Sequence, residues 1–166
     1  EKTERLIATI RERVPDIALR TTLIAGHPGE TEAHFEEMYH FVEQMRFDRL
    51  GIFTYSHEEQ THSFTMEDNV PEEVKQQRAS DIMALQQGIS QQLNAQKIGR
   101  TFKVLFDRKE GNYFVGRTEH DSPEVDKEVL VEATAEPYTR IGDFDSVHIH
   151  QAAEFDLYGT LSDHIF

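Results

Sequence analysis

Residues 21–31 (TTLIAGHPGET) constrain the fold more than any other stretch, because they join a buried strand to a helix through a tight turn. Thr21 to Ala25 is a short β-branched and apolar run, typical of a strand covered on both faces in a parallel sheet. Pro28 fixes φ for the first central position of a turn, and Gly29 accepts positive φ at the second. The sequence therefore predicts that a strand's carboxyl end meets a helix's amino end here, where α/β folds place ligands. A plain barrel connection is the alternative interpretation.

Alternating helices and strands are predicted on both sides of this turn. The expected elements are a helix over 4–14, a strand over 17–25, a helix over 32–45 and a strand over 49–55. In the second helix, Phe35, Met38, Val42 and Met45 recur at helical spacing and predict a core stripe. Thr31 suits the amino-terminal cap of that helix. Helix–strand–helix–strand order favours right-handed parallel units of a barrel or open sheet.

A polar, irregular segment over 55–70 is expected to lie over the carboxyl ends of these strands. Pro71 then begins a long helix that ends near Gly99. Its apolar positions, expected to face inward, are Val74, Ile82, Leu85, Ile89 and Leu93. Its glutamines predict a solvated outer face. We interpret this helix as a strap between two units, with domain boundaries at 1–98 and 99–166.

Short strands dominate the chain beyond Arg100. They are expected over 102–106, 113–118, 129–133, 146–152 and 157–161, at intervals that suit a small antiparallel OB-like β-barrel. His148 and His150 share one face of a strand, where metal ligation is geometrically possible but an exposed polar face is favoured. The predicted fold class is therefore α/β plus all-β.

Composition narrows the classes of function. The chain of 166 residues has no cysteine, which excludes disulfides and thiolate metal sites within it. No apolar run approaches the ~20 residues of a membrane span, so we expect a cytoplasmic protein with no membrane partner. The formal charge is −14, and from Thr101 onward 6 basic side chains stand against 14 acidic ones. Such a field repels phosphate and favours a basic partner, although acidity also maintains solubility.

Three segments, TTLIAGHPGET, FDRLGIFTYSHEE and GRTEHDSPEVD, occur in this order along the chain. In sequence and order they resemble the radical S-adenosylmethionine methylthiotransferases. The acidic stretch Asp121 to Asp126 resembles the branch that methylthiolates an aspartate of small-subunit ribosomal protein S twelve. The resemblance covers nearly the whole chain. It implies the carboxyl-terminal part of a radical-SAM (βα) barrel, followed by a terminal TRAM domain.

The resemblance also implies cofactors that the chain cannot hold alone. Full-length members use S-adenosylmethionine and two 4Fe-4S clusters, one of them held by a CxxxCxxC loop. Because this chain has no cysteine, we expect no metal ligands in it. We therefore expect a fragment that is inactive by itself.

The implied S-adenosylmethionine site lies along the strand and turn described above. Ile24 is expected to pack on adenine, and the Gly26 backbone to approach the cofactor without an intervening side chain. Pro28 and Gly29 shape this wall. Glu30 resembles the acid of the looser radical-SAM pattern, offset by one position.

The second strand is expected to contribute residues that face substrate. Tyr55 and Ser56 match the family's Tyr-Ser at the strand end, where they could face the substrate channel; for Tyr55, a core position with a surface hydroxyl is the alternative. His27 stands where phenylalanine is more usual, and Gln60 where glycine is common.

For the TRAM domain, the resemblance implies capture of the macromolecular substrate. The tRNA-modifying branch uses a basic barrel, whereas this one is acidic and suits a basic ribosomal protein. The expected docking residues are Arg117, Asp121, Glu124 and Asp126, with a plain turn over 121–126 as the alternative. Two other functions stay open, namely a related tRNA methylthiotransferase and a noncatalytic OB-like adaptor that binds a basic protein or RNA.

Overall fold

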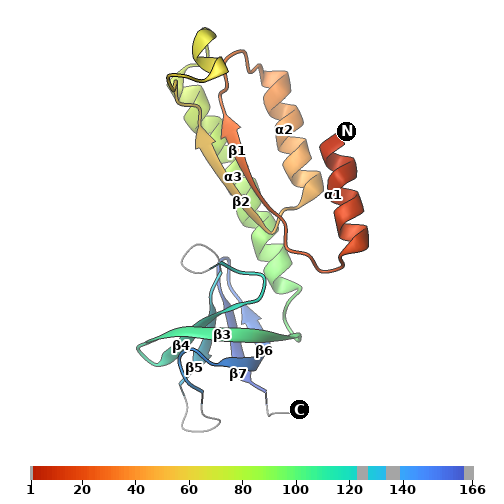
Figure 1. The fold of residues 1–166 in the computed structure, drawn as a ribbon, viewed down its shortest axis with the longest axis vertical. Coiled ribbons are helices and arrows are strands. Elements are labelled where there is room, and N and C mark those ends of the chain that lie inside the picture. The colour runs from red at the N-terminus through yellow and green to blue at the C-terminus, as the bar shows by residue number, and fades with distance from the viewer. Residues whose placement is uncertain (1, 123–126, 134–138, 163–166) are drawn as a thin grey trace. The chain divides into compact units, whose positions relative to one another are not determined.

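The computed structural model of this protein describes residues 2–122, 127–133 and 139–162. The chain divides into two compact units, Glu1–Ile89 and Ser90–Phe166 (Figure 1). Within the described ranges, no helix combines the length and the apolar character that a membrane span requires.

The first unit alternates helices and strands as expected. Its elements are α1 (Lys2–Arg13), β1 (Arg20–Ala25), α2 (Glu32–Met45), β2 (Arg49–Thr54), the 3-10 helix η1 (His62–Thr65) and the first part of α3 (Glu72–Ala95), which continues past Ile89 into the second unit. The strands β1 and β2 pair in parallel, which confirms the order predicted for this region. The first strand begins at Arg20 rather than Ile17, because the Leu19 N–H donates to the Asp48 carboxylate instead of to a strand partner.

Local capping explains why α2 has the predicted bounds. The Thr31 side chain accepts the His34 N–H, and the His34 ring accepts the Thr31 N–H, so the two form a capping box. Arg46 ends the helix in the left-handed region, with φ of 46°. In the predicted stripe Phe35 and Val42 are buried, while the two methionines are half-buried.

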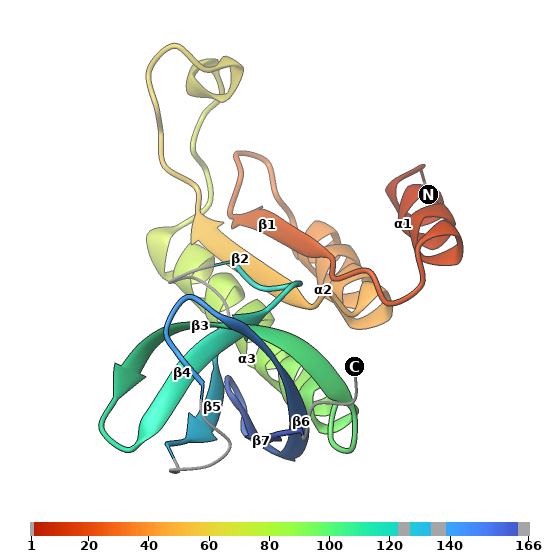
Figure 2. The same cartoon turned by 60° about the horizontal axis from the view of Figure 1, so that its bottom comes forward.

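The two strands differ from the prediction in one respect. Exposure alternates along β1, and Ile24, paired in register with Phe53 of β2, is 54% exposed. Figure 2 shows α2 and α3 behind the two strands. The prediction that β1 is covered on both faces is therefore wrong for the described residues, which leave one face of the strand pair open.

The long helix α3 is more polar on its inner face than its sequence suggested. Lys75, Arg78, Gln86 and Asn94 are buried beside the predicted apolar positions. Gln86 donates from its amide nitrogen to the Phe47 carbonyl, so not every glutamine lies on a solvated face. This hydrogen bond satisfies the Gln86 amide N–H, which would otherwise be costly to bury.

The second unit contains a closed five-stranded barrel, which confirms the OB-like prediction. Its strands are β3 (Thr101–Glu110), β4 (Tyr113–Thr118), β5 (Val129–Glu132), β6 (Phe144–Ala152) and β7 (Leu157–Leu161). They close in the order β3-β4-β5-β7-β6 around a core that includes Phe106, Ile149 and Leu157. The barrel is not wholly antiparallel, because β5 and β7 pair in parallel. His148 and His150 are exposed on β6.

Candidate functional site

A pocket of about 420 Å³ opens where β1 and β2 end. Its wall includes Ile24 and Phe53, the exposed in-register pair of the open strand face. The remaining lining residues are mostly polar: Thr22, His27, Thr54, Tyr55, Ser56, Glu58, Thr61 and Ser63. An apolar wall with a polar rim is the usual character of a small-molecule site. The pocket thus contains Ile24, Tyr55 and Ser56 from the predicted site.

The turn after β1 has the geometry that its sequence predicted. Gly29 lies at φ 81°, and the Glu30 N–H donates to the His27 carbonyl over 2.8 Å, which closes a four-residue turn around Pro28 and Gly29. Gly26, just before the turn, also has positive φ, at 79°. Two glycines therefore allow backbone conformations that other residues adopt only with strain.

Glu30 folds back into the protein rather than toward the pocket. Its Oε1 accepts the Gly26 N–H over 3.0 Å and a hydrogen bond from Arg78 Nη1 over 2.8 Å. Its side chain is 11% exposed, and it does not line the pocket. In this structure the carboxylate holds the turn together, and a direct cofactor contact stays a prediction.

The prediction for Gly26 needs a correction. We expected its missing side chain to leave room for a cofactor, but the space beside it holds the buried stem of Lys75, which a Cβ at position 26 would overlap. Glycine is needed at this position by the packing against α3 and by the positive φ.

Tyr55 lines the pocket but is largely buried. Its side chain is 8% exposed, its ring packs edge-on against His27, and the Lys75 ammonium lies 5.2 Å from the ring centroid. The hydroxyl lies 3.4 Å from Nδ1 of His57. Ser56 is exposed and donates its hydroxyl to Glu58 over 2.7 Å. Tyr55 is thus a buried wall residue, and Ser56 belongs to the polar rim.

Hydrogen bonds tie the irregular segment after β2 to the turn. His27 Nε2 lies 2.8 Å from the Ser63 hydroxyl, and the Gly29 N–H donates to the Asn69 side chain over 2.9 Å. These contacts agree with the expectation that the segment lies over the strand ends. Gln60, noted where glycine is common, has φ of 68°, a region that favours glycine.

Two buried cations of α3 were missed by sequence reasoning. Lys75 is 3% exposed and its Nζ lies 2.6 Å from Asp68, whose pKa its hydrogen bond holds below the ordinary value. Arg78 is 6% exposed and pairs with both Glu30 and Glu32. Arg78 lies four residues before the buried Ile82, and Lys75 lies three residues before Arg78. These spacings place both cations on the buried face of the helix, so helical periodicity could have predicted their burial.

Only part of the expected docking set can be placed. Arg117 is half-buried and pairs with Asp107 over 3.1 Å. Asp121 is 6% exposed and accepts a 2.6 Å hydrogen bond from the Thr118 hydroxyl, so it is not the exposed carboxylate that we expected. Glu124 and Asp126 lie outside the described residues. Their docking role, and that of Arg117, stays a prediction.

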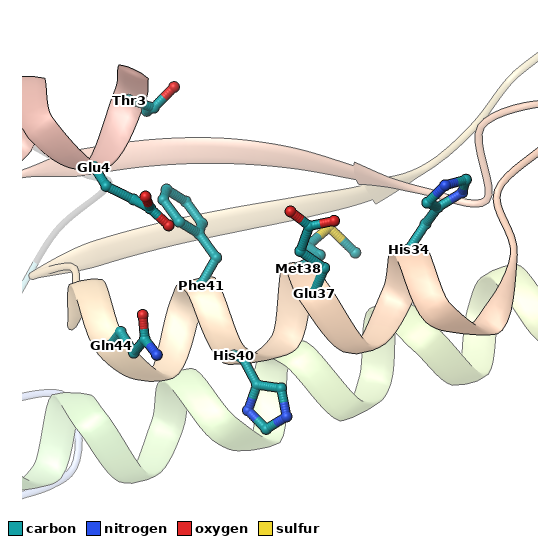
Figure 3. A pocket seen from close by; sticks show the side chains of 8 residues that line it. All are labelled: Thr3, Glu4, His34, Glu37, Met38, His40, Phe41 and Gln44. Carbon is teal, nitrogen blue, oxygen red and sulfur yellow. The ribbon is translucent and has the colours of Figure 1, made fainter. Parts of the chain in front are cut away.

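A larger pocket, of about 580 Å³, lies between α1 and α2 (Figure 3). Phe41 of α2 points toward Glu4 of α1, while His40 points away on the other side of α2 (Figure 3). His34 lies in its lining but already takes part in the capping box. No residue of the predicted site lines this pocket, so the smaller pocket remains the candidate site.

Comparison with known proteins finds similarity over both units. A TRAM domain family model matches residues 98–161. The chain is 65% identical over 160 residues to a Cytophaga hutchinsonii protein named ribosomal protein uS12 methylthiotransferase RimO, a match over 96% of this chain and 36% of that protein. Proteins of the same name from Christiangramia forsetii and Flavobacterium johnsoniae are 59% and 54% identical, over 96% and 95% of this chain and 35% and 36% of theirs. The chain spans little more than a third of the length of these relatives, and is their homologue over that part.

Proposed function

We propose, on the premise that this chain is a homologue of the ribosomal protein uS12 methylthiotransferases, that it is part of an enzyme that methylthiolates an aspartate of uS12 by radical S-adenosylmethionine chemistry. In this proposal the first unit supplies one wall of the cofactor pocket, and the TRAM domain docks the protein substrate. A ribosomal substrate also implies a cytoplasmic location. The observation that carries the proposal is that the similarity extends over both units rather than over the TRAM domain alone.

The pocket fits a cofactor with a flat aromatic base. Ile24 and Phe53 lie next to each other on paired strands, and both are exposed, 54% and 66%. An adenine ring covering them would remove apolar surface from water, at about 25 cal/mol for each Å² buried. The hydroxyl groups of Thr54 and Ser56 supply polar contacts at the rim.

The same residues suit chemistry that must exclude water. S-adenosylmethionine, when bound against this wall, would supply the radical chemistry needed to remove hydrogen from an unactivated carbon. The apolar pair Ile24 and Phe53, together with the segment bonded to His27 and Gly29, would keep water and competing hydrogen donors from the reacting carbon. The chain has no cysteine, so cluster ligands have to be supplied from outside its sequence.

Charge supports docking of a basic protein by the TRAM domain. Exposed carboxylates such as Glu110 and Glu119, each with a 70% exposed side chain, contribute to a unit in which acids outnumber bases. Complementary charge raises the encounter rate and the selectivity more than the affinity. The same charge opposes the phosphates of tRNA, the substrate of the alternative branch.

The test uses the complete enzyme with reconstituted clusters. Purified uS12 and tRNA are incubated separately with S-adenosylmethionine, reductant and a sulfur source, and their masses are measured. The proposal predicts a mass increase of one methylthio group on uS12 and none on tRNA. Modification of tRNA alone would support the other branch, and modification of neither would favour a noncatalytic role.

A further inference from the structure

Two side chains of α3 contact the turn over 26–30 on its buried side. Lys75 and Arg78 of α3 are separated by three positions and therefore lie on the same side of the helix. Both are buried, at 3% and 6% exposure, although charged side chains are seldom buried unless paired. Each ends in a carboxylate contact on another element, Asp68 and Glu30 respectively.

The Arg78 contact fixes the turn itself. Nη1 lies 2.8 Å from Glu30 Oε1 and 3.4 Å from the Glu30 carbonyl. The same Oε1 accepts the Gly26 N–H, so one carboxylate oxygen joins α3 to the beginning of the turn. Nη2 also lies 3.0 Å from Glu32 at the start of α2, but that carboxylate is 71% exposed and its contact is screened by solvent, so the buried Glu30 contact is the one that fixes the guanidinium at the turn.

The Lys75 contact supports the pocket wall beside Gly26. Its stem packs against Gly26, and its ammonium lies below the ring of Tyr55. Tyr55 and His27 both line the pocket and touch each other edge-on. If the Lys75 stem moved, both Gly26 at the start of the turn and Tyr55 in the pocket wall would lose a packing partner.

Stability alone is a poor explanation for this arrangement. A buried ion pair often contributes no more than well-packed apolar side chains would, because desolvation offsets the attraction. Directional contacts, in contrast, specify geometry, which a binding site needs to within a fraction of an ångström. From these contacts we infer that Arg78, acting through Glu30, is a positioning residue that holds the turn over 26–30 in its cofactor-binding shape, with Lys75 supporting the same wall; this inference rests on the proposed function for the identity of the ligand.

The test measures equilibrium binding of S-adenosylmethionine to the complete reconstituted enzyme. The double variant Glu30→Gln with Arg78→Met removes both charges and leaves none buried alone. It is expected to raise the Kd for S-adenosylmethionine about tenfold, since small misplacements of binding groups are costly. The matched control is Glu32→Gln, which removes the charge of the other carboxylate that contacts Arg78. Because the Glu32 side chain is 71% exposed, this variant should bind S-adenosylmethionine like wild type.

Hydrogen exchange of the turn peptide provides a readout that does not need the cofactor. Exchange at Gly26 should accelerate in the double variant and stay slow in Glu32→Gln. A folded double variant with wild-type Kd and wild-type exchange overturns the inference. If the double variant does not fold, Arg78→Lys is used, which keeps the charge but loses the forked contact, and a wild-type result for it has the same meaning. A wild-type enzyme that does not bind S-adenosylmethionine contradicts the proposed function instead, while the exchange rates still decide the role of Arg78.

Discussion

The stem of Lys75 occupies the space that a side chain at Gly26 would need. Gly26 directly follows β1, which ends at Ala25, and Lys75 lies one turn into α3, so the contact joins segments far apart in the sequence. It also lies directly behind the pocket wall, because the Lys75 ammonium faces Tyr55. Packing at Gly26 and the shape of the pocket are therefore linked.

This contact predicts different costs for alanine at two glycines of similar φ. Gly26→Ala should cost about 1 kcal/mol for positive φ and a further 1–3 kcal/mol for overpacking against Lys75. Gly29→Ala, where a Cβ would meet nothing within 4 Å, should show only the first cost. Chemical denaturation of both variants measures the difference. Equal losses would mean that the Lys75 stem moves aside freely.

The Asp68–Lys75 pair predicts a pH dependence. The hydrogen bond from Lys75 lowers the pKa of Asp68 in the folded state, so this pair stabilises the fold fully above the ordinary carboxylate pKa of about 3.9. The contribution is lost as pH falls through the lowered pKa. Asp68→Asn should therefore reduce the free energy of unfolding at pH 7, and the difference from wild type should shrink under strongly acidic conditions.

Glu72→Gln is the control for that experiment, because the Glu72 carboxylate is 4.0 Å from Lys75 and 60% exposed. It should change stability little at either pH. A loss in Asp68→Asn that is the same at both pH values would contradict an electrostatic origin.

Replacing Gly88 should stabilise α3. This glycine lies inside the helix, and a Cβ there would meet nothing within 4 Å. Gly88→Ala is expected to gain about 0.5–1 kcal/mol, since alanine loses less backbone freedom on folding. In the barrel, Gly116→Ala should do the reverse, because its Cβ would lie 2.5 Å from the Leu105 carbonyl oxygen. Thermal unfolding of the two variants in parallel tests both signs.

Docking by the TRAM domain is testable through association rates. Glu124→Lys combined with Asp126→Lys should slow the association of the complete enzyme with uS12, and added salt should slow the wild type in the same way. The control, Glu12→Lys combined with Glu36→Lys, makes the same change in net charge on α1 and α2. Surface plasmon resonance measures the association rates. Equal slowing in both double variants would mean that Glu124 and Asp126 matter only through net charge and do not form a docking site.

Features encoded locally could be predicted from the sequence. Thr31 caps α2 where its side chain indicated, and Gly29 adopts the positive φ that the Pro-Gly pair requires. The bounds of β4 and β7 agree with the alternating pattern and the flanking turns. In each case the controlling interactions lie within a few residues of one another, so a single stretch of sequence contains them.

Features that depend on distant partners were missed. Lys75 and Arg78 look like solvated residues of a polar helix until Asp68 and Glu30 are brought against them. Asp121 is a different case, because its partner is local: the Thr118 hydroxyl, three residues earlier, donates to its carboxylate, and this contact was overlooked by sequence reasoning. The parallel pairing of β5 with β7 depends on strands that are separated by β6, which no local pattern specifies.

The most direct test of the proposed function is peptide mass spectrometry of uS12 from a bacterium in which the gene containing this sequence is deleted, compared with the same strain carrying the gene again. The account predicts that the methylthio group on one uS12 aspartate is lost in the deletion strain and restored by the gene, while methylthiolated tRNA bases are unchanged. A uS12 aspartate that stays modified after the deletion, or a loss confined to tRNA, would contradict it.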